Sequence, residues 1–251
     1  MSIEARIAET YTLPSHGAIY EEDVNPDIIL SSMKTKHEML RLSATTNANK
    51  VMAEILDDCI EGDMGISSYD LCLGDYQFLL YKLRTVTFGP EYEMNGTCPY
   101  CGSVNYLSVN LDDLEVKEYS DELAEKMVVH LPESDCDVTL TLQTPRILDK
   151  INRLVQDRKR RTKTSSSENS LMLFTITESI TEVDGEPINK FTIDEWVKEL
   201  PMKDTNILLN RINEINNMIG VQTDVGDICT TCGRYYDAPF QINGTFFRPR
   251  D

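Results

Sequence analysis

The chain has 251 residues, of which 41% are hydrophobic, enough for one large domain or two small ones with a buried core. Its 24 Lys and Arg residues stand against 42 Asp and Glu residues, which gives a formal net charge of −18. An acidic surface repels phosphate backbones and anionic membranes, and no apolar run reaches the ~18 residues that a membrane-spanning helix needs, so both nucleic acid and membrane are unfavourable partners.

Residues 1–33 are predicted to form an extended N-terminal arm. In the segment Tyr11–Tyr20, Pro14 fixes one φ angle and removes a donor, while Gly17 permits a turn. Such an arm buries little area by itself, so we expect it to pack over the domain or onto a neighbouring chain.

Residues 34–89 are predicted to be a helical segment. The run Thr35–Glu38 fits a capping box at a helix start, in which a hydroxyl and a carboxylate satisfy free backbone N–H groups. Apolar residues spaced by one, three and four predict a second helix over 51–60. A third helix is expected from about Leu71 to Thr87, where Gly89 and a proline stop it.

Residues 90–144 and 218–251 are predicted to form a β module around two cysteine motifs. Strands are expected in four places before the next helix: near Tyr92, and over residues 104–109, 127–131 and 137–143. Near the C-terminus, Asn243 followed by Gly244 predicts a hairpin turn.

Residues 145–217 are predicted to be a helical insertion into this module. Thr144 followed by Pro145 is typical of a helix N-cap and first helical position. This helix is expected to fray at a basic cluster formed by Arg158–Arg161 and Lys163. Three further helices are expected over residues 168–181, 193–200 and 202–217. The first of them is expected to end at a turn formed by Asp184 and Gly185.

The two cysteine motifs are the strongest chemical signal in the chain. Cys98 and Cys101 form one C-x-x-C pair, Cys229 and Cys232 form the other, and a glycine follows each pair. Two residues between thiolates let both sulfurs reach one metal at ~2.3 Å, and the glycine permits the tight turn of a zinc knuckle. Thiolates favour zinc or an iron–sulfur cluster over hard cations. One structural Zn²⁺ site is therefore predicted.

The spacing of the motifs leaves two alternatives, a redox dithiol or cysteines that are simply buried. A separation of 127 residues, 102 to 228, requires the intervening chain to fold as an insertion. A redox motif needs only one pair, preferably at a helix start. The N-terminus lacks a secretory signal, so we expect a reducing cytoplasm and no disulfide framework. The lone cysteines, expected to be small core residues, are Cys59, Cys72 and Cys136.

No constellation of catalytic residues is recognisable, and a non-enzyme is predicted. Four thiolates leave no open coordination position for a catalytic zinc. His37-Glu38 lacks the second His of a metalloprotease motif, and neither a nucleophile elbow nor a phosphate-binding glycine loop is present. Carboxylates are too numerous for a catalytic pair to stand out.

Four motifs in a fixed order indicate a family. They are Tyr11-x-Leu13-Pro14-Ser15-x-Gly17-x-x-Tyr20, Met33-Lys34-Thr35-Lys36-His37-Glu38, Asp75-x-x-x-Leu79-Leu80-x-x-x-Arg84-x-x-x-Phe88-Gly89 and Cys98-Pro99-Tyr100-Cys101-Gly102. In this order the chain resembles the baseplate hub proteins of T-even-type contractile-tailed bacteriophages, most strongly over residues 13–102 and again around 180–247.

The resemblance implies a structural subunit or assembly factor of the central baseplate hub, located in the virion tail and, during assembly, in the host cytoplasm. Its partners would be other hub or tail proteins, with homo-oligomers as a further option. Leu13, Pro14, Gly17 and Tyr20 would anchor the arm on a partner, and the zinc would rigidify the β module. The implied fold is α+β, a mainly helical body with a small antiparallel zinc-ribbon-like module.

Two other hypotheses remain open. The knuckles and the basic cluster over 158–163 are compatible with a zinc-ribbon nucleic-acid-binding protein, although the net charge of −18 opposes it. An enzyme such as a hydrolase is the third hypothesis, and no residue pattern supports it.

Overall fold

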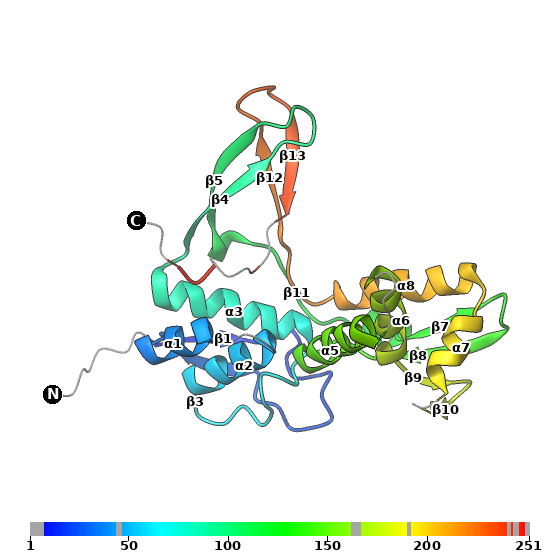
Figure 1. Cartoon of the computed structure of the whole chain (residues 1–251). Helices are drawn as coiled ribbons and strands as arrows, with labels where there is room; N and C mark the ends of the chain where they lie inside the picture. The colour runs from blue at the N-terminus through cyan, green and yellow to red at the C-terminus, as the bar shows by residue number, and fades with distance from the viewer. Residues whose placement is uncertain are drawn as a thin grey trace.

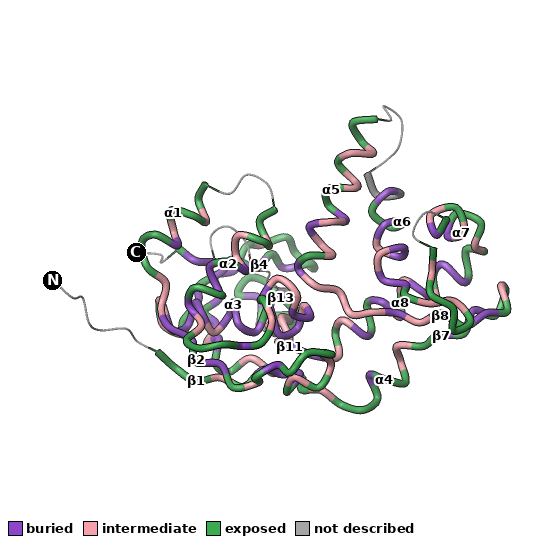
Figure 2. Tube along the Cα trace, turned by 90° about the horizontal axis from the view of Figure 1, so that it is seen from below, coloured by how far each residue is buried: buried purple, intermediate pink, exposed green. Residues whose placement is uncertain are grey.

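The chain folds around two hydrophobic cores and one projecting β module in a computed structural model that describes residues 8–43, 47–161, 167–189, 192–239, 242 and 246–248 (Figure 1). The first core takes most of its side chains from residues 11–116 and 221–247, and the second from residues 119–219. The second core is therefore built from a segment inserted into the first. Figure 2 shows buried residues gathered in both places.

The first core extends from the β module described below to a three-stranded antiparallel sheet and its neighbouring helices. The strands, in spatial order, are β1 (Ala8–Thr12), β2 (Asp27–Ser31) and β3 (Ile60–Glu61). The helices are α1 (Thr35–Ser43), α2 (Ala48–Cys59) and α3 (Leu73–Phe88). All three predicted helices are present, and α3 is the central one because most of its residues are buried.

The start of α1 differs from the predicted capping box. Both carboxylate oxygens of Glu38 accept bonds from Arg41, at 2.8 and 2.7 Å, and so Glu38 does not reach back to the helix start. Instead, Nδ1 of His37 accepts the backbone N–H of Lys34 at 3.0 Å. The hydrogen bond that Glu38 was expected to make to the backbone at the helix start is thus replaced by one that the His37 imidazole makes, one residue earlier in the chain.

Residues 8–33 fold back on themselves and are not an extended arm. Strand β1 pairs with β2 in antiparallel register from Ala8↔Ser31 to Thr12↔Asp27. The connecting segment is held by its own apolar residues, since Leu13 is fully buried in the first core together with Val24. Burial of these side chains against α3 supplies the free energy that an isolated arm would lack.

The second core lies between a four-stranded antiparallel sheet and five helices. The strands, in spatial order, are β10 (Glu186–Pro187), β9 (Ile180–Val183), β8 (Cys136–Leu140) and β7 (Val128–Leu131). The helices are α4 (Glu122–Lys126), α5 (Pro145–Arg161), α6 (Ser167–Ser179), α7 (Ile193–Glu199) and α8 (Met202–Asn216).

Two predictions about this region need correction. The helix expected over 168–181 ends at Ser179, because the next four residues form β9 and pair with β8. The turn at Asp184 and Gly185 therefore joins β9 to β10, and it does not follow a helix. Strands β7 and β8 belong to this sheet, so they lie in the second core and apart from the cysteine module.

The chain crosses between the two cores twice, and these crossings pair with each other. They are β6 (Val116–Lys117), which follows the short 3₁₀ helix η1 (Leu111–Asp113), and β11 (Gly220–Val221). Beside β11, the Cα of Gly74 on α3 approaches the backbone of Ile219 so closely that a Cβ would overlap its carbonyl. Only glycine fits there. The absence of a side chain at Gly74 therefore lets α3 of the first core and Ile219 of the second core lie in direct backbone contact.

A second link between the cores is a helix cap supplied from another helix. The buried carboxylate of Asp149 on α5 accepts the backbone N–H of Lys50 in the first turn of α2 at 3.0 Å. It also accepts the Asn49 side-chain amide at 2.9 Å and the Tyr69 hydroxyl at 3.1 Å. An acceptor at a helix N-terminus satisfies otherwise unpaired donors, so α5 stabilises α2 directly.

The β module stands away from the body above α3 (Figure 1). It consists of two hairpins, formed by the strands β4 (Glu91–Thr97) with β5 (Val104–Asn110) and β12 (Asp224–Ile228) with β13 (Tyr235–Pro239). At its base, the buried guanidinium of Arg84 on α3 donates to the carbonyls of Gly89 at 2.6 Å and Glu91 at 3.0 Å.

The C-terminal segment also fastens the module to the body. Phe246 is fully buried, with its ring centroid 5.3 Å from that of Tyr81 on α3 and 5.2 Å from that of Tyr92 on β4. Edge-on and tilted aromatic contacts of this kind add to area burial. The hairpin turn predicted at Asn243-Gly244 lies outside the described residues.

Candidate metal centre

The first cysteine motif forms the tip of the β4–β5 hairpin. Thr97 and Val104 are the last paired residues, and the motif lies between them. The backbone N–H of Cys98 donates to the carbonyl of Ser103 at 2.9 Å, and the N–H of Gly102 donates to the carbonyl of Cys98 at 2.9 Å. Gly102 has a φ of 73°, a conformation that favours glycine.

The second cysteine motif repeats this geometry at the tip of the β12–β13 hairpin. Ile228 and Tyr235 are the last paired residues. The N–H of Cys229 donates to the carbonyl of Arg234 at 2.9 Å, and the N–H of Gly233 donates to the carbonyl of Cys229 at 2.8 Å. Gly233 has a φ of 70°. The two motifs are thus matched knuckles whose backbones aim their sulfurs inward.

The four knuckle sulfurs meet between the two tips. All four Sγ atoms lie within 4.8 Å of one another, with Cys98 to Cys232 at 3.8 Å and Cys101 to Cys229 at 3.6 Å. Zinc held tetrahedrally at Zn–S ≈ 2.3 Å places its sulfurs about 3.8 Å apart, whereas a disulfide requires about 2.05 Å. The four residues predicted as ligands are therefore brought together, at the separations that a single metal ion needs.

The surroundings favour the thiolate, the form that binds a metal, at two of the four sulfurs. The pKa of Cys229 is lowered to about 5, first by the hydroxyl of Ser103, which lies 3.1 Å from the sulfur, and then by the backbone N–H of Cys232. The pKa of Cys101 is also lowered, again chiefly by the Ser103 hydroxyl at 3.1 Å. Ser103 thus serves one sulfur from each knuckle. At Cys232 the backbone N–H of Arg234 lowers the pKa, but burial and the neighbouring cysteines outweigh it and raise the pKa to about 11.

Asn105 is a second supporting residue that the sequence reasoning missed. Its side-chain oxygen accepts the backbone N–H of Thr230 at 3.0 Å and the Thr230 hydroxyl at 2.8 Å, while its amide lies 3.7 Å from the sulfur of Cys229. It therefore ties the first hairpin to the second knuckle. The available signal was a buried asparagine at an inward position of an alternating strand.

The residues predicted to anchor an arm on a partner make contacts within the chain. Leu13 and Pro14 are buried, and Gly17 has a φ of 75° with its Cα facing the carbonyl of Val24. The half-buried Tyr20 also packs against the first core. Their predicted contact with a partner remains a prediction, and their internal role is established by these contacts.

Asp75 on α3 is the centre of a buried network that organises this N-terminal motif. Its carboxylate accepts the backbone N–H of Ser15 at 2.9 Å, the Ser15 hydroxyl, and the Tyr20 hydroxyl at 2.6 Å. The same Tyr20 oxygen accepts the N–H of Cys72 at 3.1 Å. Burial raises the pKa of Asp75, and the bonds from Ser15 and Tyr20 partly offset this. Two of the sequence motifs are therefore one structural unit.

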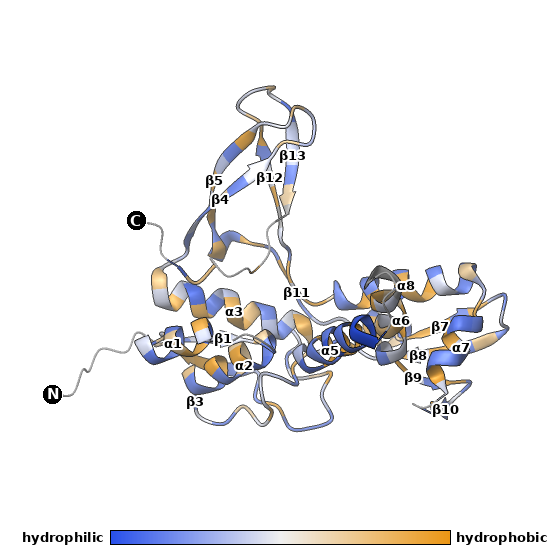
Figure 3. Cartoon of the chain, in the orientation of Figure 1, coloured by the Kyte–Doolittle hydropathy of each residue, from blue (hydrophilic) through white to orange (hydrophobic). Residues whose placement is uncertain are grey.

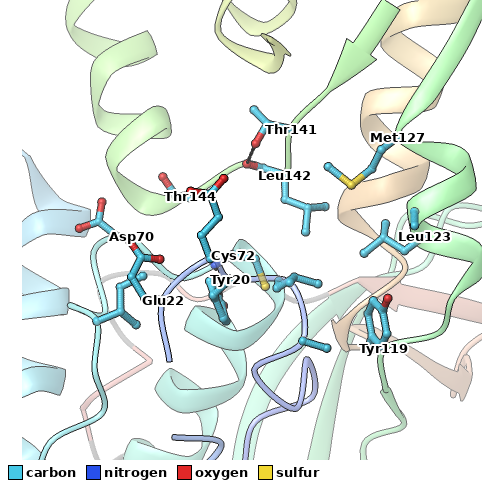
Figure 4. Close-up of a pocket in the computed structure, with 15 residues that line it drawn as sticks. Tyr20, Glu22, Asp70, Cys72, Tyr119, Leu123, Met127, Thr141, Leu142 and Thr144 are labelled. Atoms are coloured by element: carbon cyan, nitrogen blue, oxygen red, sulfur yellow. Dashed lines mark hydrogen bonds between the residues drawn. The ribbon is translucent and has the colours of Figure 1, made fainter. Parts of the chain in front are cut away.

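A pocket of about 470 Å³ lies where this network meets the second core (Figure 4). Carboxylates of Glu22 and Asp70 lie at one end, and Leu123 and Met127 lie at the other. Burial raises the pKa of the Cys72 thiol, the only thiol that lines the pocket, to about 12. A thiol that stays protonated is a poor nucleophile, so Cys72 lacks the activation that cysteine catalysis requires.

His37 and Cys59 also approach each other, with Nδ1 to Sγ at 3.4 Å, while Nε2 of His37 lies 2.7 Å from Asp58. Both side chains are buried, and Nδ1 already accepts the N–H of Lys34. A substrate could not reach this sulfur, and the imidazole acts as a helix-start residue. The other histidines form exposed pairs, His16 with Glu118 and His130 with Asp137.

The basic cluster lies on α5, away from the cysteine module, and Figure 3 shows the end of that helix as strongly hydrophilic. The guanidinium of Arg158 lies 5.8 Å from the ring centroid of Phe174, and Arg160 pairs with Asp157 at 3.7 Å. Lys163 lies outside the described residues. None of the described helices is both long and apolar enough to cross a membrane.

Comparison with known proteins gives one match. The family model described as T4 bacteriophage base plate protein matches residues 10–248. Neither the curated proteins nor the solved structures gave a match. The matched range includes the N-terminal motif, Asp75, both knuckles and the C-terminal Phe246. The chain therefore belongs to the family of T4 bacteriophage base plate proteins, as its order of motifs predicted.

Proposed function

We propose that the chain is a structural subunit or assembly factor of the central hub of a contractile-tailed phage baseplate, and that it acts by docking on other proteins. Family membership itself indicates a structural role in the phage baseplate and a location in the virion tail. The match over residues 10–248 carries the proposal, because it spans both cores and the cysteine module together.

The proposal includes one structural Zn²⁺ held by Cys98, Cys101, Cys229 and Cys232. A four-sulfur cluster with zinc-like separations supports it, as do the paired knuckle turns. Four thiolates complete a tetrahedron and leave no position for substrate, so the metal would be structural. Metal binding by small zinc modules contributes folding free energy on the order of 10 kcal/mol. The two hairpins would then form a zinc-ribbon-like module on a helical body.

Docking would involve other hub or tail proteins, with copies of the same chain as a second option. A baseplate family of structural proteins favours a non-enzymatic role, and the buried, protonated Cys72 thiol is consistent with it. The internal contacts of Leu13, Pro14, Gly17 and Tyr20 support an indirect role for these residues, in which they hold the surface that a partner meets.

The proposal is tested by placing a nonsense codon in this reading frame and examining the particles by electron microscopy. Accumulation of heads and free baseplate parts without complete tails is expected, with rescue by the chain supplied in trans. Normal tails in the absence of the chain would refute a hub role. Mass spectrometry of purified wild-type virions then distinguishes a retained subunit from an assembly factor that leaves.

A further inference from the structure

Exposed apolar side chains surround the sulfur cluster at the tip of the module. Tyr100 is 57% exposed, Val104 56%, Ile228 62% and Tyr235 62%. Each lies within three residues of a cysteine. Val104 lies on the outer face of the first hairpin, because its neighbour Asn105 faces the second hairpin. Ile228 and Tyr235 form a pair on the outer face of the second, so the four residues flank the cluster on two sides. We call these four residues the tip patch. Isolated exposed apolar residues are ordinary, but a group around one rigid centre, at the end of a projecting module, indicates an interaction site.

Parts of the tip patch are held in place before any partner arrives. A Cβ at Gly226 would overlap the hydroxyl of Tyr235, so the glycine leaves the space in which that ring lies across its own hairpin. On the other knuckle, the ring centroid of Tyr100 lies 5.1 Å from the guanidinium carbon of Arg234. This cation–π contact joins one knuckle to the other. Pre-ordered aromatic side chains lose little entropy on binding.

The charge of the module restricts what can bind there. Over residues 90–110 and 224–239 the sequence has five carboxylates and one basic residue, Arg234, so the formal charge is 1 − 5 = −4. A zinc ion with four thiolates would add a further −2. Nucleic acid and anionic membranes are repelled by such a module, and so is a second copy of the same module. A basic protein surface is the complementary partner.

We propose that the tip patch is the surface by which this chain docks into the baseplate, and that its partner is a protein with an apolar pocket bordered by Lys and Arg. This inference rests on the proposed function and names the docking surface and the chemistry of its partner. Because these residues lie on both sides of the tip, the partner's pocket would enclose it, and a metal that joined the knuckles would hold the two sides together.

The test uses the full-length chain, co-expressed in turn with each tail protein that the same phage encodes. The tip variant carries Tyr100→Ser, Ile228→Ser and Tyr235→Ser. The matched control carries Met39→Ser and Leu42→Ser, two apolar residues of α1 that are 68% and 56% exposed. Zinc content and far-UV circular dichroism equal to wild type establish that each variant is folded.

We expect the wild-type chain and the control to bind one tail protein equally well. The tip variant should bind it at least about 30-fold more weakly, as for loss of a central aromatic anchor. Binding of the wild type should weaken as salt rises. Equal binding by the tip variant would overturn the inference and leave the proposed function intact. Binding whose strength does not depend on salt, an acidic partner surface, or binding of the tip only to another copy of the chain would do the same. No binding of the wild type to any tail protein would instead count against docking itself.

Discussion

Replacing Asp75 on α3 with alanine should destabilise the fold, because this carboxylate holds the N-terminal motif in place. The substitution removes the acceptor for three donors, the Ser15 N–H, the Ser15 hydroxyl and the Tyr20 hydroxyl. Asp75 and Ser15 are both fully buried, so water does not replace the lost bonds. A contact that links residues 60 positions apart also fixes the loop between β1 and β2 on α3.

The size of the effect follows from these contacts. Each buried donor left without an acceptor costs about 1–3 kcal/mol. Relief of the buried charge and rotation of the two hydroxyls offset part of the sum, so we expect a net loss of about 3 kcal/mol. For a chain of this length that corresponds to a fall in Tm of about 6–12 °C. Asp75→Asn keeps one oxygen acceptor and should cost less.

Urea unfolding followed by far-UV circular dichroism measures the loss, with Tyr20→Phe and the double variant completing a thermodynamic cycle. Tyr20→Phe alone should cost about 1–2 kcal/mol, since it also strands the N–H of Cys72. In the Asp75→Ala background it should cost less, with a coupling of about 1 kcal/mol. A loss below about 1 kcal/mol for Asp75→Ala, or additive effects, would refute the network as the anchor of the motif.

Three further predictions concern the metal module, the contact between the cores and the loss of stability at low pH. Cys98→Ser should abolish stoichiometric metal binding and loosen the module. The fluorescence of Trp196, the single tryptophan, should stay unchanged because this residue packs on the second core, and a shifted spectrum would contradict this separation. Gly74→Ala should lower Tm by several degrees, because its Cβ would overlap the backbone of Ile219. Gly62 has open space around it, so Gly62→Ala should cost only its backbone strain, and equal losses for the two variants would refute the steric argument. Asp58 has a pKa lowered from 3.8 to about 2, first by Lys36 and then by His37, so its stabilisation is present above pH 3.8 and lost as the pH falls toward 2. The Asp58→Asn variant should therefore lose less unfolding free energy than the wild type over that interval, by a small amount because the carboxylate is half exposed. The same pH dependence in the variant and the wild type would contradict the pairing.

The sequence predicted the elements whose signals are local. The apolar spacing and Gly89 placed a helix over about 71–87, and α3 spans Leu73–Phe88. The cluster of four cysteines was also predicted, because a repeated C-x-x-C carries its chemistry in a few adjacent residues. Their partnership across 128 positions was inferred from the matching chemistry of the two motifs.

What the sequence did not reveal depends on contacts between distant residues. The pairing of β1 with β2, and the hydrogen bonds that Ser15 and Tyr20 donate to Asp75, make the expected arm part of the first core. Residues 180–183 extend a helical pattern, yet they pair with β8, whose second edge would otherwise leave buried backbone N–H and C=O groups unpaired. Ser103 acquires its role at the sulfur cluster only once the two hairpins are stacked, which no local pattern encodes.

The most direct test of a structural zinc that joins the two knuckles is the metal and thiol content of the purified full-length chain. Elemental analysis is predicted to give one zinc per chain. In thiol titration of the folded protein, a strong chelator should expose four additional cysteines to the reagent, while the buried Cys59, Cys72 and Cys136 stay protected. Absence of stoichiometric metal, with Cys98, Cys101, Cys229 and Cys232 all freely reactive, would contradict the account.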